Sequence, residues 1–190
     1  MAAGASRTAG RDRILSAMEI DYDRRHFSML ARYNRTCNGT LTALLATLSE
    51  GEFYAERGSH FGSIHGIMQH LIMCDINWMR RFRELFGSEA VLSHPRLQPA
   101  GHAWTRYEVG TLEELERERK IVDGLLEAFV AGADTARFGE MLAYSDSSGT
   151  PRRYVFRNVL GHVFNHQTHH RGQVSQILDE MGVEMRNAFP

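Results

Sequence analysis

The chain has 190 residues, of which 43% are hydrophobic and 24% are charged, and its formal net charge at pH 7 is -1. This balance is typical of a globular domain with a single core, rather than of a disordered chain. A nearly neutral chain has no global positive field to attract nucleic acid, so we predict no nucleic-acid partner. No segment reaches the ~20 apolar residues of a membrane span, so we predict no association with a membrane.

The N-terminal residues 1–20 are predicted to form a loosely ordered lead-in. Residues 1–10 are small and polar and lack the apolar run of a signal peptide. The two cysteines, Cys37 and Cys74, have no paired spacing, which is typical of free thiols in a reducing compartment. We therefore expect the protein to be cytoplasmic. Its length and composition predict one domain, which covers residues 21–190.

Apolar residues recur at helical spacings in four segments. The first helix is predicted over residues 21–48, and after a short polar connection the second runs from Ser63 to about Phe86. Two prolines and little periodicity in residues 88–110 predict a long connection. The third helix is predicted to begin at Thr111, whose hydroxyl can cap it, and the fourth covers residues 154–181.

The polar segment at residues 145–149 separates two short stretches, 137–144 and 152–156, that are predicted to pair as a small hairpin. Four long helices with a long connection between the second and third indicate an all-α fold. The prediction is a four-helix bundle with a small β-hairpin between its third and fourth helices.

The histidines are unusually concentrated, because four of the ten fall within residues 161–171. His166 and His170 are four residues apart in a predicted helix, so their side chains lie about 40° apart and can bind one metal. The third ligand is expected from His70, in the apolar part of the second helix, where an unbonded imidazole is costly. The alternative is that His70 is a core histidine bonded to a backbone carbonyl.

Three further side chains near this site have open roles. Cys74 follows His70 by four residues and could be a thiolate ligand, although a buried cysteine is more commonly a packing residue. His162 precedes His166 by four residues and lies further around the helix from His170. It is expected beside the three ligands rather than among them. Asp75 is a candidate general base, with an ion pair to an arginine such as Arg81 as the alternative.

Three segments resemble the DinB family of metal-binding proteins. They are Tyr33-Asn34, the stretch FGSIHGIMQHL at residues 61–71 with Asp75 and WMRRF after it, and NHQTHHRGQ at residues 165–173. The resemblance covers residues 23–183. It implies an up-down-down-up helix order, a homodimer, and a divalent metal on His70, His166 and His170.

Two functions agree with these observations. Three histidines leave positions free for water or substrate, as in catalytic metal sites, and a bound metal lowers the pKa of water or a thiol. This favours a metal-dependent enzyme of the thiol-transferase or hydrolase type that acts on an unknown small molecule. The expected metal cofactor is zinc, nickel or iron. The family resemblance also implies a low-molecular-weight thiol as a candidate partner, because relatives in the wider superfamily include thiol-dependent transferases and isomerases. The alternative is a non-catalytic, dimeric, stress-related metal-binding module.

Overall fold

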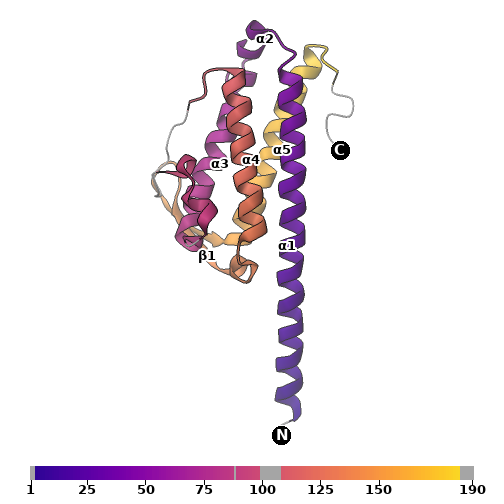
Figure 1. Ribbon diagram of the computed structural model, residues 1–190, viewed down its shortest axis with the longest axis vertical. Coiled ribbons are helices and arrows are strands. Elements are labelled where there is room, and N and C mark those ends of the chain that lie inside the picture. The colour runs from indigo at the N-terminus through magenta and orange to yellow at the C-terminus, as the bar shows by residue number, and fades with distance from the viewer. Residues whose placement is uncertain (1–2, 88, 99–107, 185–190) are drawn as a thin grey trace.

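The structure is a computed structural model that describes residues 3–87, 89–98 and 108–184. Side chains are not described for residues 3–17 and 19–21. Four long helices form a bundle (Figure 1). They are α1 (Ala3–Leu45), α3 (Ile64–Phe86), α4 (Leu112–Gly132) and α5 (Phe156–Glu180). The prediction of an all-α four-helix bundle is confirmed.

Shorter elements connect these helices. Helix α2 (Glu50–Tyr54) follows α1, and three 3-10 helices lie at η1 (Ala90–Ser93), η2 (Pro95–Leu97) and η3 (Thr135–Gly139). Strands β1 (Met141–Ser145) and β2 (Pro151–Val155) pair antiparallel, with Leu142 opposite Tyr154 and Tyr144 opposite Arg152. The predicted hairpin is therefore confirmed, although its first strand begins later than expected because residues 135–139 form η3.

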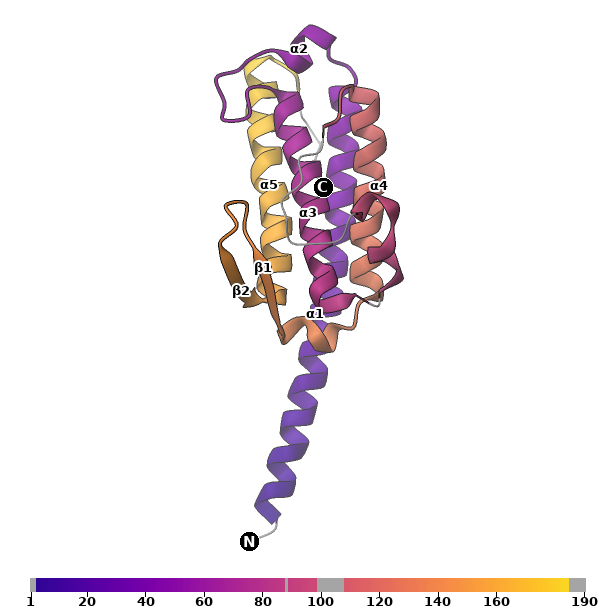
Figure 2. The ribbon, with the colours of Figure 1, turned by 90° about the vertical axis from the view of Figure 1, so that its left-hand side faces the viewer.

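The helices run up, down, down and up, as Figures 1 and 2 show. Helix α1 rises to the end of the bundle where α2 lies. Helices α3 and α4 both descend from that end, and α5 returns to it. The connection from α3 to α4 must therefore travel the length of the bundle, which explains why it is long. Residues 99–107 of this predicted connection lie outside the described residues.

Two helix starts show why the sequence boundaries were predictable. The Ser63 hydroxyl accepts a hydrogen bond from the Gly66 amide at 3.1 Å and caps α3. At the start of α4, the Thr111 hydroxyl accepts from the Glu114 amide at 3.1 Å, and the Glu114 carboxylate accepts from the Thr111 amide at 3.2 Å. Each arrangement satisfies amide groups that have no partner inside the helix.

An aromatic cluster fills the end of the bundle where the hairpin leaves it. Its members come from α3, α4, η3 and α5, have at most 1% exposure, and show ring centroid distances of 4.7 to 6.1 Å. They are Phe82, Phe86, Phe129, Phe138 and Phe156. Large rings packed edge to face stabilise this end of the core and hold the hairpin beside α3 and α5.

The start of α1 differs from the prediction. Residues 3–20 were expected to be a loosely ordered lead-in, whereas α1 begins at Ala3 and its N-terminal part extends beyond the other helices (Figures 1 and 2). Apolar periodicity reports packing against a core, so it does not identify a helical segment that projects past the bundle. Although α1 has 43 residues, neither it nor any other described helix is long and apolar enough to cross a membrane.

Helix α2 was also not predicted, because its segment was interpreted as a polar connection. Ser49 and Glu52 form a capping box, in which the Glu52 carboxylate accepts from the Ser49 amide at 2.8 Å. Phe53 is 1% exposed and anchors this short helix on the bundle. Two adjacent aromatic residues in a polar segment give too little periodicity to predict a helix of five residues.

Candidate metal centre

Three histidines from two antiparallel helices converge near the middle of the bundle. His70 on α3 and His170 on α5 place their Nε2 atoms 3.1 and 3.0 Å, respectively, from Nε2 of His166. One nitrogen of each ring lies within 4.8 Å of those of the other two. The structure therefore brings together the three residues that the sequence predicted as metal ligands, at a spacing that could hold one ion.

Two neighbouring side chains fix the orientation of these rings. His170 Nδ1 lies 2.6 Å from Gln173 Oε1, and because an amide oxygen only accepts, Nδ1 is the donor. This tautomer leaves the lone pair of His170 Nε2 directed at the other two histidines. Phe61 stacks on His70 with ring centroids 4.1 Å apart and meets His170 edge-on at 5.2 Å.

Gly66 allows Phe61 to reach this position. A Cβ atom built on Gly66 would lie 1.9 Å from the carbonyl oxygen of Phe61. The backbone of the preceding loop is therefore packed directly against the first turn of α3. The absence of a side chain at residue 66 is what brings Phe61 over the His70 ring.

We expect Gly66→Ala to lower the free energy of unfolding by about 1–3 kcal/mol, since the loop backbone must move to make room. Gly172→Ala is the matched control, because a Cβ on this helical glycine of α5 meets nothing within 4 Å. Alanine there should be neutral or stabilising by up to about 1 kcal/mol. Urea denaturation measures both, and equal effects of the two substitutions would contradict the close packing of Phe61 on Gly66.

The three imidazoles favour their neutral form. Desolvation, assisted by the nearby charge of His170, lowers the pKa of His70 to about 4. Desolvation and the same neighbour lower the pKa of His166 to about 3. Desolvation also lowers the pKa of His170, although its hydrogen bond to Gln173 opposes this. Neutral imidazole is the form that binds metals, so no proton needs to be displaced from these rings near pH 7.

Comparison with known proteins agrees with this geometry. A sequence profile of the DinB family matches residues 22–188. The chain belongs to the DinB family. Protein DinB of Bacillus subtilis (strain 168) is 23% identical over 154 residues, which cover 80% of this chain and 84% of that protein. No solved structure matches the chain.

In this DinB-family protein, Asp75 lies in a buried ion pair. Its side chain is 1% exposed and accepts from Arg119 of α4 at 2.7 Å and from the Gln167 amide of α5. Desolvation raises the pKa of Asp75, and the charge of Arg119 opposes that effect. The ion-pair alternative considered for Asp75 is therefore present, with Arg119 as the partner rather than Arg81. Arg81 instead donates to the carbonyl of Ser145 at 2.7 Å.

The ion pair belongs to a polar network that joins all four long helices. Arg119 also pairs with Asp123 at 2.8 Å, and Asp123 accepts from Asn38 of α1 at 3.0 Å. Asn38 in turn accepts from Arg171 of α5 at 3.0 Å, and Arg171 also donates to Asn34. Gln167 and Arg171, the members of this network on α5, directly follow His166 and His170 in the sequence.

Sequence reasoning missed Asn38, Arg119 and Asp123 in this network. A detectable signal existed for the pair on α4, because Arg119 and Asp123 occupy the same helix face as the buried Leu115 and Val122. Charged residues four apart on an apolar helix face are almost always paired in the folded protein. Their partners on α1 and α3 could not be inferred from that spacing.

Cys74 and His162 both lie next to the three-histidine group. Cys74 Sγ is 3.4 Å from His70 Nε2, but the thiol is 4% exposed, and burial raises its pKa to about 12. His162 is exposed, and its ring centroid lies 5.9 Å from that of His166. Neither belongs to the group of mutually close ligand atoms that the described residues form.

Proposed function

We propose that this DinB-family protein binds one divalent transition metal through His70, His166 and His170 and uses it as an enzyme. The observation that carries the proposal is the convergence of three Nε2 atoms, with neighbouring pairs 3.0 and 3.1 Å apart. Two metal–nitrogen bonds of about 2.0–2.1 Å at a tetrahedral angle span about 3.3 Å, so small adjustments would seat an ion. Imidazole donors suit zinc, nickel and iron.

An open site supports catalysis rather than a structural role. Structural zinc sites close with four protein ligands, whereas three histidines leave a position for water or substrate. When bound, the metal would lower the pKa of that water or of a substrate thiol, so that the group could lose its proton near neutral pH. Gln173 would hold His170 in the ligating tautomer, and Phe61 would shield one face of His70 from water. We infer a thiol transferase or hydrolase acting on a small molecule, with a low-molecular-weight thiol as the candidate cosubstrate.

A non-catalytic metal-binding module is the second candidate, and Cys74 is the observation that favours it. Its sulfur lies 3.4 Å from His70 Nε2. A thiolate there would add a fourth protein ligand and close the site in the manner of structural zinc. In that case the metal would tie α3 to α5. The three-histidine donor set and the burial of the Cys74 thiol favour the open site.

We also propose that the protein works as a cytoplasmic homodimer. Large apolar residues on α1 are exposed at spacings of four, seven and four, which places them on one face of that helix. They are Met18, Tyr22, Met29 and Tyr33, with exposures of 65%, 62%, 47% and 37%. A second copy could cover this stripe, and sedimentation equilibrium of the purified protein tests whether the chain is dimeric.

Metal content per chain tests the proposed site. Untagged parent protein, prepared with zinc, nickel or iron, is expected to carry about one equivalent, and His70→Ala, His166→Ala and His170→Ala should each lose it. His162→Ala and His169→Ala are matched controls on α5 that should retain the metal, since both side chains are exposed and lie outside the group. Circular dichroism confirms that every variant is folded.

A folded parent without metal under replete conditions would rule the site out. Equal loss in the control variants would also contradict it, because the effect would not depend on the three ligands. If metal binds, assays of thiol transfer and hydrolysis separate the two candidate functions. A turnover that disappears in His170→Ala supports the enzyme, whereas closure of the site by Cys74 predicts that Cys74→Ala loses metal as well.

A further inference from the structure

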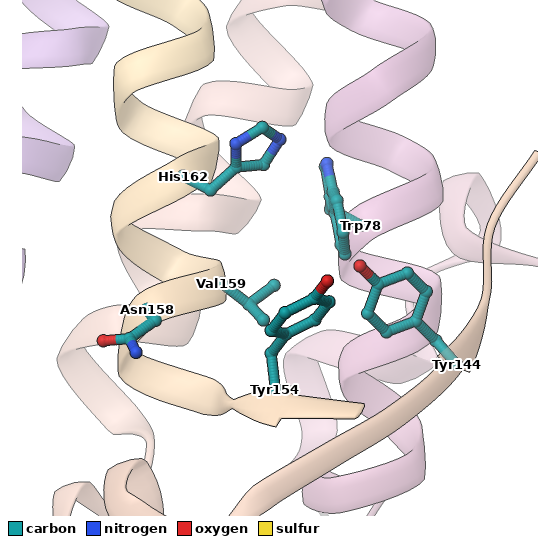
Figure 3. Close-up of a pocket in the computed structure, with 6 residues that line it drawn as sticks. All are labelled: Trp78, Tyr144, Tyr154, Asn158, Val159 and His162. Carbon is teal, nitrogen blue, oxygen red and sulfur yellow. The ribbon is translucent and has the colours of Figure 1, made fainter. Parts of the chain in front are cut away.

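A pocket lies between α3, α5 and the hairpin, beside the three-histidine group. Its volume is about 310 Å³, in the range of small-molecule sites. Figure 3 shows Trp78 of α3 and His162 of α5 directed toward one another, with Tyr144 and Tyr154 of the two strands beside them. The pocket is lined by Trp78, Tyr144, Tyr154, Asn158, Val159 and His162.

This pocket adjoins the three histidines through His162. The His162 ring meets Trp78 edge-on at a centroid distance of 5.6 Å and lies 5.9 Å from the His166 ring. Phe61 covers His70 and His170 from another direction. The exposed His162 side chain therefore neighbours both Trp78 of the pocket and His166 of the metal-ligand group.

The lining has the chemistry of an aromatic-binding site. The Trp78 and Tyr144 rings meet edge-on at 5.1 Å, and Tyr154 lies 6.4 Å from Tyr144. The two tyrosines share one face of the hairpin, because Tyr154 pairs with Leu142, two residues before Tyr144. Tyr154 is 50% exposed, so a ligand would bury ring surface that the fold leaves in water. Flat rings pack on such walls by stacked and edge-on contacts.

A buried positive charge behind the wall limits the ligand's charge. The guanidinium carbon of Arg81 lies 4.8 Å from the ring centroids of both Trp78 and Tyr144, and Arg81 is only 3% exposed. Because the Arg81 guanidinium already lies over both rings, it would repel a second cation bound against the same rings and would not repel an anion. The electrostatics therefore favour a neutral or anionic molecule.

From these contacts we infer that the pocket binds the planar aromatic group of a neutral or anionic small molecule, whose reactive group faces the three histidines. The inference rests on the proposed function, because it names the substrate class of that metal site. The binding step itself depends on the pocket walls and does not need the metal. The two proposals can therefore fail separately.

Fluorescence of Trp78 provides a direct binding test. The sequence contains two tryptophans, so the Trp104→Phe protein reports on Trp78 alone. In chelator-treated protein, phenol and benzoate are expected to give saturable changes in emission. Benzylamine tests the effect of Arg81 and should bind at least about tenfold more weakly than benzoate. Cyclohexanecarboxylate has the charge of benzoate without the flat ring, and it should also bind more weakly.

Two variants and one control locate the binding. Tyr154→Ala removes an exposed wall residue and should weaken benzoate binding about threefold to tenfold, the usual contribution of an aromatic pair. Val159→Phe places a larger side chain in the lining of the pocket and should therefore block binding. Tyr54→Ala removes a tyrosine of α2 with 36% exposure outside the pocket and should leave binding unchanged.

The absence of saturable binding by every aromatic probe would overturn the inference. It would also be overturned by benzylamine or cyclohexanecarboxylate binding as tightly as benzoate, or by equal effects of Tyr154→Ala and Tyr54→Ala. Protein that carries metal but binds no aromatic probe would overturn the pocket alone. Protein that binds the probes but carries no metal would support the pocket and overturn the proposed metal enzyme.

Discussion

Arg119→Met is expected to lower the free energy of unfolding by about 3–5 kcal/mol, the usual effect of breaking a buried ion pair from one side. The Arg119 side chain is 2% exposed and contacts Asp75 at 2.7 Å and Asp123 at 2.8 Å, and both carboxylates are equally buried. Removing the cation leaves two buried negative charges with their main counterion missing. Urea denaturation at pH 7 measures the loss.

The dependence on pH identifies the cause of that loss. Desolvation already raises the pKa values of Asp75 and Asp123, and Arg119 opposes the rise at both carboxyls. Without Arg119 the pKa values of the folded state move further above those of the unfolded chain, so the folded state binds protons more readily. The deficit of Arg119→Met should therefore be larger at pH 8 and shrink as the pH falls toward 5.

Two comparisons make the prediction specific. Arg35→Met removes an ion pair of 2.8 Å with Glu127 in which the arginine is 60% exposed, and exposed pairs contribute at most about 1 kcal/mol. Adding Asp75→Asn and Asp123→Asn to Arg119→Met should recover part of the stability, because the unpaired charges are gone. A loss no greater than that of Arg35→Met would show that the buried network does not depend on Arg119.

Gln173→Leu is expected to weaken zinc binding by about tenfold to one hundredfold, as is usual when the partner of a ligating histidine is lost. Gln173 Oε1 accepts from His170 Nδ1 at 2.6 Å, and this bond selects the tautomer with a free Nε2. Leucine has a similar size and cannot accept. Competition with a chromophoric chelator measures the zinc dissociation constant.

Gln176→Leu is the matched control, because this residue lies one turn further along α5 and bonds Glu180 at 3.0 Å rather than a histidine. Its zinc affinity should equal that of the parent. Gln173→Glu should retain or increase affinity, since a carboxylate is the stronger acceptor for the His170 N–H. If Gln173→Leu binds zinc as tightly as the control, the hydrogen bond does not support the metal site.

The sequence by itself determined the features that depend on a few neighbouring residues. Helical periodicity located the bundle helices, and a hydroxyl cap at Thr111 marked the start of α4. The four-residue spacing of His166 and His170 placed two candidate ligands on one face of α5. His70 followed from a polar ring in an apolar helix segment, so all three members of the candidate metal site were predictable.

Only the tertiary structure decided which residues from different helices meet. The sequence offered Arg81 of the same helix as an example of a partner for Asp75, whereas the packing of α3 against α4 pairs Asp75 with Arg119. The approach of Phe61 to His70 depends on close packing at Gly66. The aromatic pocket depends on the position of the hairpin beside Trp78. Periodicity and capping act within one or two turns, whereas helix rotation and register are set by packing of the whole core.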